Sequence, residues 1–247
     1  MSGHEQDPAA FWEQRYGGVE RVWSGSVNAA LAAVVTEHVD PSGSALACVD
    51  DGPRGRDAGW QPRSLDLGCG EGGDVLWLAE RGWDASGLDL SPTAVARAKD
   101  EAQARGLRPH FFVTDLSEWA EQTFAAGASD AYELVTASFL QSPVRLPRTD
   151  VLRAATRHVV PGGYLVVISH GAPPAAAAGE DSGHCHHAPD SFPTPASELA
   201  GLALDPTDWD VVVNESWARD GVTSRGERVA ATDIVTVARR LTGEASD

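Results

Sequence analysis

Leu65-Asp66-Leu67-Gly68-Cys69-Gly70-Glu71-Gly72-Gly73 is the most informative segment of the chain. An apolar run of strand length passes into four glycines, and a helical pattern of apolar residues follows up to residue 81. Glycines allow a tight turn and let a ligand approach the backbone, while the start of the helix offers free N–H groups. The stretch therefore predicts a ligand-binding turn between a strand and a helix.

Around this turn, short apolar runs alternate with helix-length segments, which is typical of a mostly parallel α/β sheet. Two helical patterns over residues 11–39 and a loop over residues 41–62 precede it. We expect an N-terminal helical cap and linker over residues 1–62 and a core over residues 63–247, forming one structural domain. Strands are expected at residues 64–67, 85–90, 110–113, 132–137 and 164–169, with two more near residues 209–213 and 233–238.

The composition disfavours several classes of partner. The 247 residues include 19 Lys and Arg against 36 Asp and Glu, which gives a net charge of -17. Such a charge repels nucleic-acid phosphates and anionic lipids, so we expect neither nucleic acid nor a membrane as partner. The polar N-terminus and three widely spaced cysteines without a CxxC motif lead us to expect a cytoplasmic protein.

The glycine pattern alone leaves two cofactors open. Gly68, Gly70 and Gly73 also satisfy the dinucleotide fingerprint, and Asp89 at the end of the second strand could hold ribose hydroxyls in either case. Asp66 separates the two, because a buried carboxylate there would repel a pyrophosphate and favour a cationic amino group. This charge favours S-adenosyl-L-methionine over NAD.

The same residues carry a family resemblance. Asp66 to Gly72, followed by Gly87-Leu88-Asp89-Leu90-Ser91, resembles motif I and the acidic second-strand motif of class I S-adenosylmethionine-dependent methyltransferases. Thr114-Asp115-Leu116 is similar to the position that receives the adenine amino group, and Ala137-Ser138-Phe139 to the strand end beside the methionine moiety. The resemblance covers roughly residues 64–170. It implies cofactor contacts at Asp66, Gly68, Cys69, Gly70, Gly72, Asp89, Leu90, Ser91, Asp115, Leu116 and Ser138.

The resemblance also implies the fold class and a lid. The expected architecture is a Rossmann-like, doubly wound, mostly parallel seven-stranded sheet with an antiparallel C-terminal strand and an N-terminal helical cap. Phe11-Trp12 to Tyr16, Trp23-Ser24-Gly25 and Asn28 resemble the lid of the tellurite-resistance and thiopurine-type methyltransferases. Tyr16 and Trp23 are then either cofactor contacts, since an aromatic face suits a sulfonium cation, or ordinary core aromatics.

Histidines supply the remaining candidates. His170, at the end of the fifth strand, is the candidate catalytic residue. His184, His186 and His187 flank Cys185 and could bind a metal, but no second spaced pair completes a site, so we expect an exposed loop and no metal. Residues 171–195 follow a strand end and are the candidate lid over the acceptor. Arg219, Arg225 and Arg228 are expected to be solvated charges.

These features predict an enzyme that transfers a methyl group from S-adenosylmethionine to a small molecule such as a metalloid, a thiol or a specialised metabolite. Such a transfer is an in-line displacement that mainly requires alignment, and a general base is needed only for a protonated acceptor. An NAD-dependent oxidoreductase and a non-catalytic cofactor-binding or regulatory protein remain as alternatives. The sequence leaves the acceptor atom and the oligomeric state, including a homodimer, open.

Overall fold

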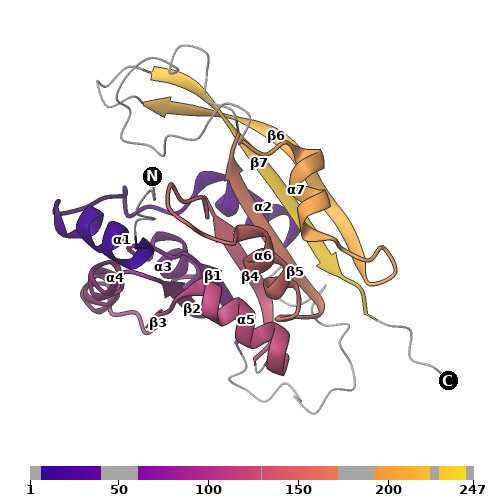
Figure 1. Ribbon diagram of the computed structural model, residues 1–247, viewed down its shortest axis with the longest axis horizontal. Coiled ribbons are helices and arrows are strands. Elements are labelled where there is room, and N and C mark those ends of the chain that lie inside the picture. The colour runs from indigo at the N-terminus through magenta and orange to yellow at the C-terminus, as the bar shows by residue number, and fades with distance from the viewer. Residues whose placement is uncertain (1–6, 40–60, 129, 172–191, 223–227, 243–247) are drawn as a thin grey trace, which may run out of the picture.

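The computed structural model describes residues 7–39, 61–128, 130–171, 192–222 and 228–242. Its centre is a seven-stranded sheet of order β3-β2-β1-β4-β5-β7-β6 (Figure 1). Strands β1 to β5 pair in parallel, whereas β7 is antiparallel to both β5 and β6. The strands are β1 Arg63–Leu67, β2 Asp84–Asp89, β3 His110–Val113, β4 Tyr132–Ser138, β5 Val159–His170, β6 Trp209–Val222 and β7 Arg228–Arg240.

Helices cover both faces of the sheet (Figure 1). One core lies between the sheet and helices α2, α3 and α4, and the other between the sheet and α5, α6 and α7. Val75 of α3 and Val151 of α6 have no exposed surface in their respective cores. The helices are α1 Pro8–Gly17, α2 Ala29–His38, α3 Gly73–Ala79, α4 Pro92–Ala104, α5 Leu116–Ala126, α6 Arg148–Thr156 and α7 Pro195–Leu202.

Local sequence explains where several helices begin. The Ser91 hydroxyl accepts a hydrogen bond from Ala94 N, and Pro92 occupies the first turn of α4, where it needs no N–H partner. Asn28 caps α2 by accepting from Ala30 N and Leu31 N. Side-chain caps therefore fix the first residue of both helices.

This architecture confirms the expected fold class, and three strands are longer than expected. β5 begins at Val159 because Val159 pairs with Tyr132, and an irregular register then brings Tyr164 opposite Leu134. The expected turn Pro161-Gly162-Gly163 thus lies inside β5. β6 and β7 continue pairing beyond the last β5 partner, Asp233, and form an arm that projects past the sheet (Figure 1).

Some expectations fall outside the described residues. Residues 41–60 of the expected linker and most of the loop 171–195 are among them. Within the described ranges, no helix has both the length and the apolar character needed to cross a bilayer.

Candidate functional site

The glycine loop connects β1 to α3 and lies against β2. Gly68 N and Cys69 N both donate to Leu88 O, at 2.8 and 2.9 Å, which ties the loop to the end of β2. Gly72 has φ +83°, and a Cβ there would lie 2.9 Å from both Ala98 Cβ and the Phe111 ring. Only glycine therefore permits this turn and this close packing of α4.

Asp89 ends β2 and holds the loop from the other side. Its Oδ2 accepts from Gly70 N at 2.8 Å, and its Oδ1 accepts from Ser91 N at 2.9 Å. The side chain is buried, and burial raises the pKa of Asp89 despite these hydrogen bonds. Because a carboxylate has about four acceptor positions, Asp89 can still accept from ligand hydroxyls.

Asp66 lies in β1 beneath the glycine loop. It is 4% exposed and accepts a 2.6 Å hydrogen bond from Thr136 Oγ1 of the neighbouring strand β4. Burial, followed by the nearby charge of Asp74, raises the pKa of Asp66 well above its usual value. No Lys or Arg of the described residues forms a salt bridge with Asp66, Asp74 or Asp89.

The other residues predicted to contact the cofactor lie at the ends of β3 and β4. Asp115 comes after β3 and caps α5 by accepting from Ser117 N at 2.7 Å, and Leu116 behind it is buried. Ser138 is the last residue of β4. The fold thus brings the predicted residues of β1 to β4 to the carboxyl ends of four adjacent strands, the edge at which open α/β sheets bind ligands.

Tyr16 and Trp23 of the N-terminal segment cover the glycine loop. Trp23 Nε1 donates to Tyr16 Oη at 2.9 Å, and a Cβ on Gly70 would lie 3.1 Å from that oxygen. Tyr16 is 3% exposed, and burial, helped by the charge of Asp89, raises the pKa of its phenol. Both aromatics therefore lie at the predicted site; whether they contact a cofactor stays a prediction.

An ion pair between buried Glu71 and partly exposed Arg97, which the sequence analysis missed, holds this segment in place. Glu71 accepts from Trp23 N at 3.0 Å and from Val22 N, and Arg97 Nη1 lies 2.9 Å from its carboxylate. Arg97 also donates to the carbonyls of Tyr16 and Val19, at 3.0 and 2.6 Å. We call residues 16–23 the lid segment. One signal was visible in the sequence, namely a charged residue, Glu71, in a loop of otherwise small residues, but its partners were not.

Helix α1 is attached at two further points. Its Glu13 accepts from Ser91 Oγ at 2.7 Å and from the Thr93 hydroxyl, so it sits at the start of α4. These hydrogen bonds lower the pKa of Glu13. Trp12 Nε1 donates to Ser142 Oγ at 3.2 Å, in the segment after β4. Helix α1 therefore bridges the carboxyl edge from β2 to β4.

His170 lies at the end of β5 against Phe139. The two rings stack with centroids 3.8 Å apart and 9° between their planes, and Phe139 adopts φ +54°, a strained value for a bulky residue. The Gln141 side chain accepts from His170 N at 2.7 Å and donates to His170 O at 3.3 Å. These contacts fix His170 at the edge beside the end of β4.

The expectation for Arg219 was wrong. Its Nε donates to both carboxylate oxygens of buried Asp233, at 2.9 and 3.1 Å, and its guanidinium lies 5.5 Å from the Phe139 ring centre. Extended pairing of β6 with β7 carries Arg219 to this position, which periodicity alone could not indicate.

The predicted weak metal ligands His184, His186 and His187 lie outside the described residues. The residues that the structure does describe contain no group of side chains that could hold a metal ion.

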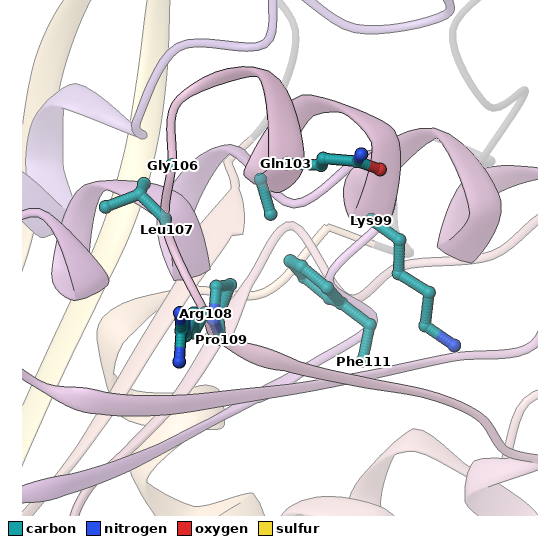
Figure 2. A pocket seen from close by; sticks show the side chains of 8 residues that line it. Lys99, Gln103, Gly106, Leu107, Arg108, Pro109 and Phe111 are labelled. Atoms are coloured by element: carbon teal, nitrogen blue, oxygen red, sulfur yellow. The ribbon is translucent and has the colours of Figure 1, made fainter.

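A cavity of about 340 Å³ lies elsewhere, between the end of α4 and the start of β3. Figure 2 shows the Phe111 ring between Lys99 and the turn at Arg108 and Pro109. This cavity is at the amino end of β3, opposite to the end that carries Asp115. None of the predicted site residues lines it.

Comparison with known proteins agrees with this arrangement. Residues 65–163 match the model of a methyltransferase domain family. A relative from Mycobacteroides abscessus, 2-heptyl-1-hydroxyquinolin-4(1H)-one methyltransferase, is 37% identical over 105 residues, or 42% of this chain and 44% of the relative. The chain thus spans less than half the length of this curated relative.

Two solved structures share the fold. One, described for the conversion of a disulfide bond into a thioacetal group during echinomycin biosynthesis, has a TM-score of 0.66 at 22% identity and covers 97% of this chain and 94% of its own. The other, TehB from Haemophilus influenzae, has a TM-score of 0.58 at 14% identity, and the match covers 92% of this chain and 66% of the TehB chain. These two likenesses show a shared fold, and the family match over residues 65–163 agrees with the resemblance to methyltransferases.

Proposed function

We propose that this chain, whose residues 65–163 match the model of a methyltransferase domain family, is a class I methyltransferase that binds S-adenosylmethionine and methylates a small molecule. One observation carries the choice of cofactor. Asp66 and Asp89 are buried on either side of the glycine loop, and no salt bridge from a described Lys or Arg compensates them. Uncompensated carboxylates favour a cationic ligand and disfavour the pyrophosphate of NAD.

The residues present suit each part of this cofactor. Asp89 holds the ribose hydroxyls, Asp115 and Leu116 border the adenine, and the glycine loop leaves room for the chain that connects ribose and sulfur. S-adenosylmethionine supplies an electrophilic methyl group on a sulfonium sulfur. The protein aligns that methyl group with the acceptor, and such positioning can contribute about 7–11 kcal/mol.

The lid segment excludes water from the same site. Tyr16 lies over Gly70, and Glu71 with Arg97 holds the backbone of the lid segment in place. An aromatic ring beside a sulfonium adds a favourable cation–π interaction of about 0.5–2 kcal/mol. Tyr16 and Trp23 therefore belong to our proposed cofactor site.

A small acceptor is supported by the relative that methylates 2-heptyl-1-hydroxyquinolin-4(1H)-one and by the net charge of -17, which opposes nucleic acid. Phe139 and His170 form the proposed acceptor wall beside the end of β4. For an acceptor that is protonated at working pH, His170 is the proposed base. A metalloid, a thiol and a specialised metabolite remain the acceptor classes.

Methyl transfer itself tests the proposal. Purified protein is incubated with S-adenosylmethionine labelled in its methyl group and with an extract of small metabolites, and label in new small molecules is measured against heat-treated protein. We expect enzyme-dependent label in the small-molecule fraction. Firm binding of S-adenosylhomocysteine without any transferred label would support the non-catalytic alternative. We further propose a cytoplasmic location; a homodimer stays a prediction.

A further inference from the structure

The cavity at the amino end of β3 has no part in the proposed function. Its volume of about 340 Å³ falls within the range of about 300–1,000 Å³ that small-molecule sites span. Lys99 and Gln103 are one helical turn apart on α4, so they extend from the same face of the helix. The apolar lining comes from Leu107, Pro109 and the Phe111 ring, and the polar lining from Lys99, Gln103 and Arg108.

The two cations of this cavity have no acidic partner. Six other arginines within the described ranges form ion pairs with carboxylates. The side chains of Lys99, which is the only lysine of the chain, and Arg108 form neither a salt bridge nor a hydrogen bond with any residue that the structure describes. In a chain with 36 acidic residues, two such cations at one cavity create a local positive potential that attracts an anion.

The end of helix α4 does not need these cations. Carbonyls in the last turn of a helix carry a partial negative charge, which a nearby lysine or arginine can cap. Here the backbone N–H groups of residues 105–107 donate to the carbonyls of Glu101, Ala102 and Gln103, at 2.9 to 3.1 Å. Lys99 and Arg108 are therefore available to a ligand.

The Phe111 ring connects the cavity to the glycine loop. Phe111 is 4% exposed and lines the cavity, and a Cβ placed on Gly72 would lie 2.9 Å from its Cζ, so the ring packs directly against the loop. Figure 2 shows this ring beside Lys99. Helix α4 makes a second connection, because Arg97, which holds the lid segment, precedes Lys99 by two residues.

We propose that this cavity binds an aromatic anion, with a flat ring on Phe111 and a carboxylate or phosphate between Lys99 and Arg108, and that its occupancy strengthens binding at the cofactor site. A filled cavity holds the Phe111 ring against Gly72 and fixes α4 together with the lid segment. By thermodynamic linkage, each ligand then raises the affinity for the other by the same factor. The coupling rests on the proposed function, whereas the anion site does not.

Titration calorimetry with three probes tests the anion site. 1-Naphthyl phosphate carries ring and anion, 1-naphthol the ring alone and inorganic phosphate the anion alone. We expect 1-naphthyl phosphate to bind about 10-fold tighter than either part, and Lys99→Gln/Arg108→Gln to abolish that advantage. The matched control Arg81→Gln/Arg157→Gln removes two exposed cations that do not line the cavity and should leave all three affinities unchanged.

S-adenosylhomocysteine tests the coupling. When it saturates the protein, we expect 1-naphthyl phosphate to bind about 5-fold tighter, and the reverse titration to give the same factor. In Lys99→Gln/Arg108→Gln this factor should fall to about 1, while the affinity for S-adenosylhomocysteine without the probe equals that of the wild type.

The possible failures are distinguishable. Equal affinities for 1-naphthyl phosphate and 1-naphthol, or an undiminished affinity in Lys99→Gln/Arg108→Gln, would overturn the anion site and leave the proposed function standing. An unchanged factor of about 1 in the wild type, or competition between the probe and S-adenosylhomocysteine, would overturn the coupling. If the wild type binds no S-adenosylhomocysteine, the proposed function and the coupling both fall, and the three probe titrations still decide the anion site.

Discussion

The Asp89 carboxylate joins three segments at the residue scale. It accepts from the glycine loop at Gly70 and from Ser91 at the start of α4, while it ends β2 itself. The same oxygens that shape the loop therefore face the proposed ribose position. A substitution should weaken both ligand binding and the loop.

We expect Asp89→Ala to weaken binding of S-adenosylhomocysteine by about 1–3 kcal/mol, because ligand hydroxyls and two backbone N–H groups lose their acceptor. Isothermal titration calorimetry measures this loss. The control Asp84→Ala removes a half-buried acid, paired with His110, at the amino end of the same strand, and should leave the affinity unchanged. An unaltered affinity in Asp89→Ala would contradict the site.

The pH dependence of Asp66 gives a second prediction. Because burial and Asp74 raise its folded-state pKa, the folded protein binds more protons than the unfolded chain above about pH 4. Stability is therefore lost as the pH rises through the folded-state pKa. Replacing Asp66 with Asn removes the free-energy cost of charging this buried carboxyl and keeps an oxygen that can accept the hydrogen bond from Thr136.

We expect ligand-free Asp66→Asn to melt about 2–4 °C higher than the wild type at pH 8, with a smaller gain at pH 5. Circular dichroism melts over this pH range measure the difference, and Asp210→Asn, an exposed site on β6, is the control. A variant that is less stable by the same amount at every pH would show that the Asp66 charge carries no penalty.

Much of this residue-scale site was predictable, because the acids and glycines of β1 to β4 stand next to strand ends in the sequence. Glu71 and Asp74 were not, although both lie beside the predicted loop. Their roles depend on Arg97 and Asn28, which folding brings from other elements. Side-chain partners that lie far apart along the sequence leave no local sequence pattern from which the contact could be predicted.

At the element scale, the lid segment depends on α4. Arg97 of that helix neutralises buried Glu71 and holds two lid carbonyls, so the charge pair and the lid form one unit. Removing one partner of a buried pair leaves the other charge uncompensated, which is strongly destabilising. The lid should loosen while the sheet stays intact.

We expect Arg97→Ala to increase hydrogen exchange in residues 16–23 by about 10-fold or more without changing exchange in β1 and β4. Exchange measured by mass spectrometry locates the effect, and affinity for S-adenosylhomocysteine should fall with it. Arg105→Ala, which removes exposed ion pairs of the same helix, is the control. Equal protection of residues 16–23 in both variants would contradict the proposed anchor.

Element positions followed from the sequence, whereas some lengths did not. Strand β5 and the β6–β7 arm extend beyond their apolar patterns, since backbone pairing with a neighbour continues where the side chains turn polar. The same gap led us to expect Arg219 to be solvated, because the sequence pattern does not show that β6 extends to this residue. Only the pairing of β6 with β7 brings its partner Asp233 beside it.

At the scale of the whole molecule, the sheet order places every proposed cofactor contact at one edge. β1 and β4 are adjacent although β2, β3 and the three helices α3, α4 and α5 separate them in the chain, and the crevice between them is where ligands bind in such sheets. Alternating strands and helices predicted a doubly wound, mostly parallel sheet, whereas the order of its strands comes from the structure.

The net charge of -17 applies to the molecule as a whole. We expect a labelled RNA hairpin to bind no more tightly than about 100 μM at physiological salt. Fluorescence anisotropy with a salt titration measures this. A low-micromolar affinity that weakens steeply with added salt would place nucleic acid among the acceptors and contradict the small-molecule proposal.

We propose that the carboxylates of Asp66 and Asp89 and the glycine loop between them bind a cationic adenosyl amino acid. Calorimetric titration of the wild-type protein with S-adenosylmethionine and, separately, with NAD tests it most directly. We expect a single site for S-adenosylmethionine in the micromolar range or tighter and no heat of binding with NAD. Binding of NAD with no binding of S-adenosylmethionine would contradict it.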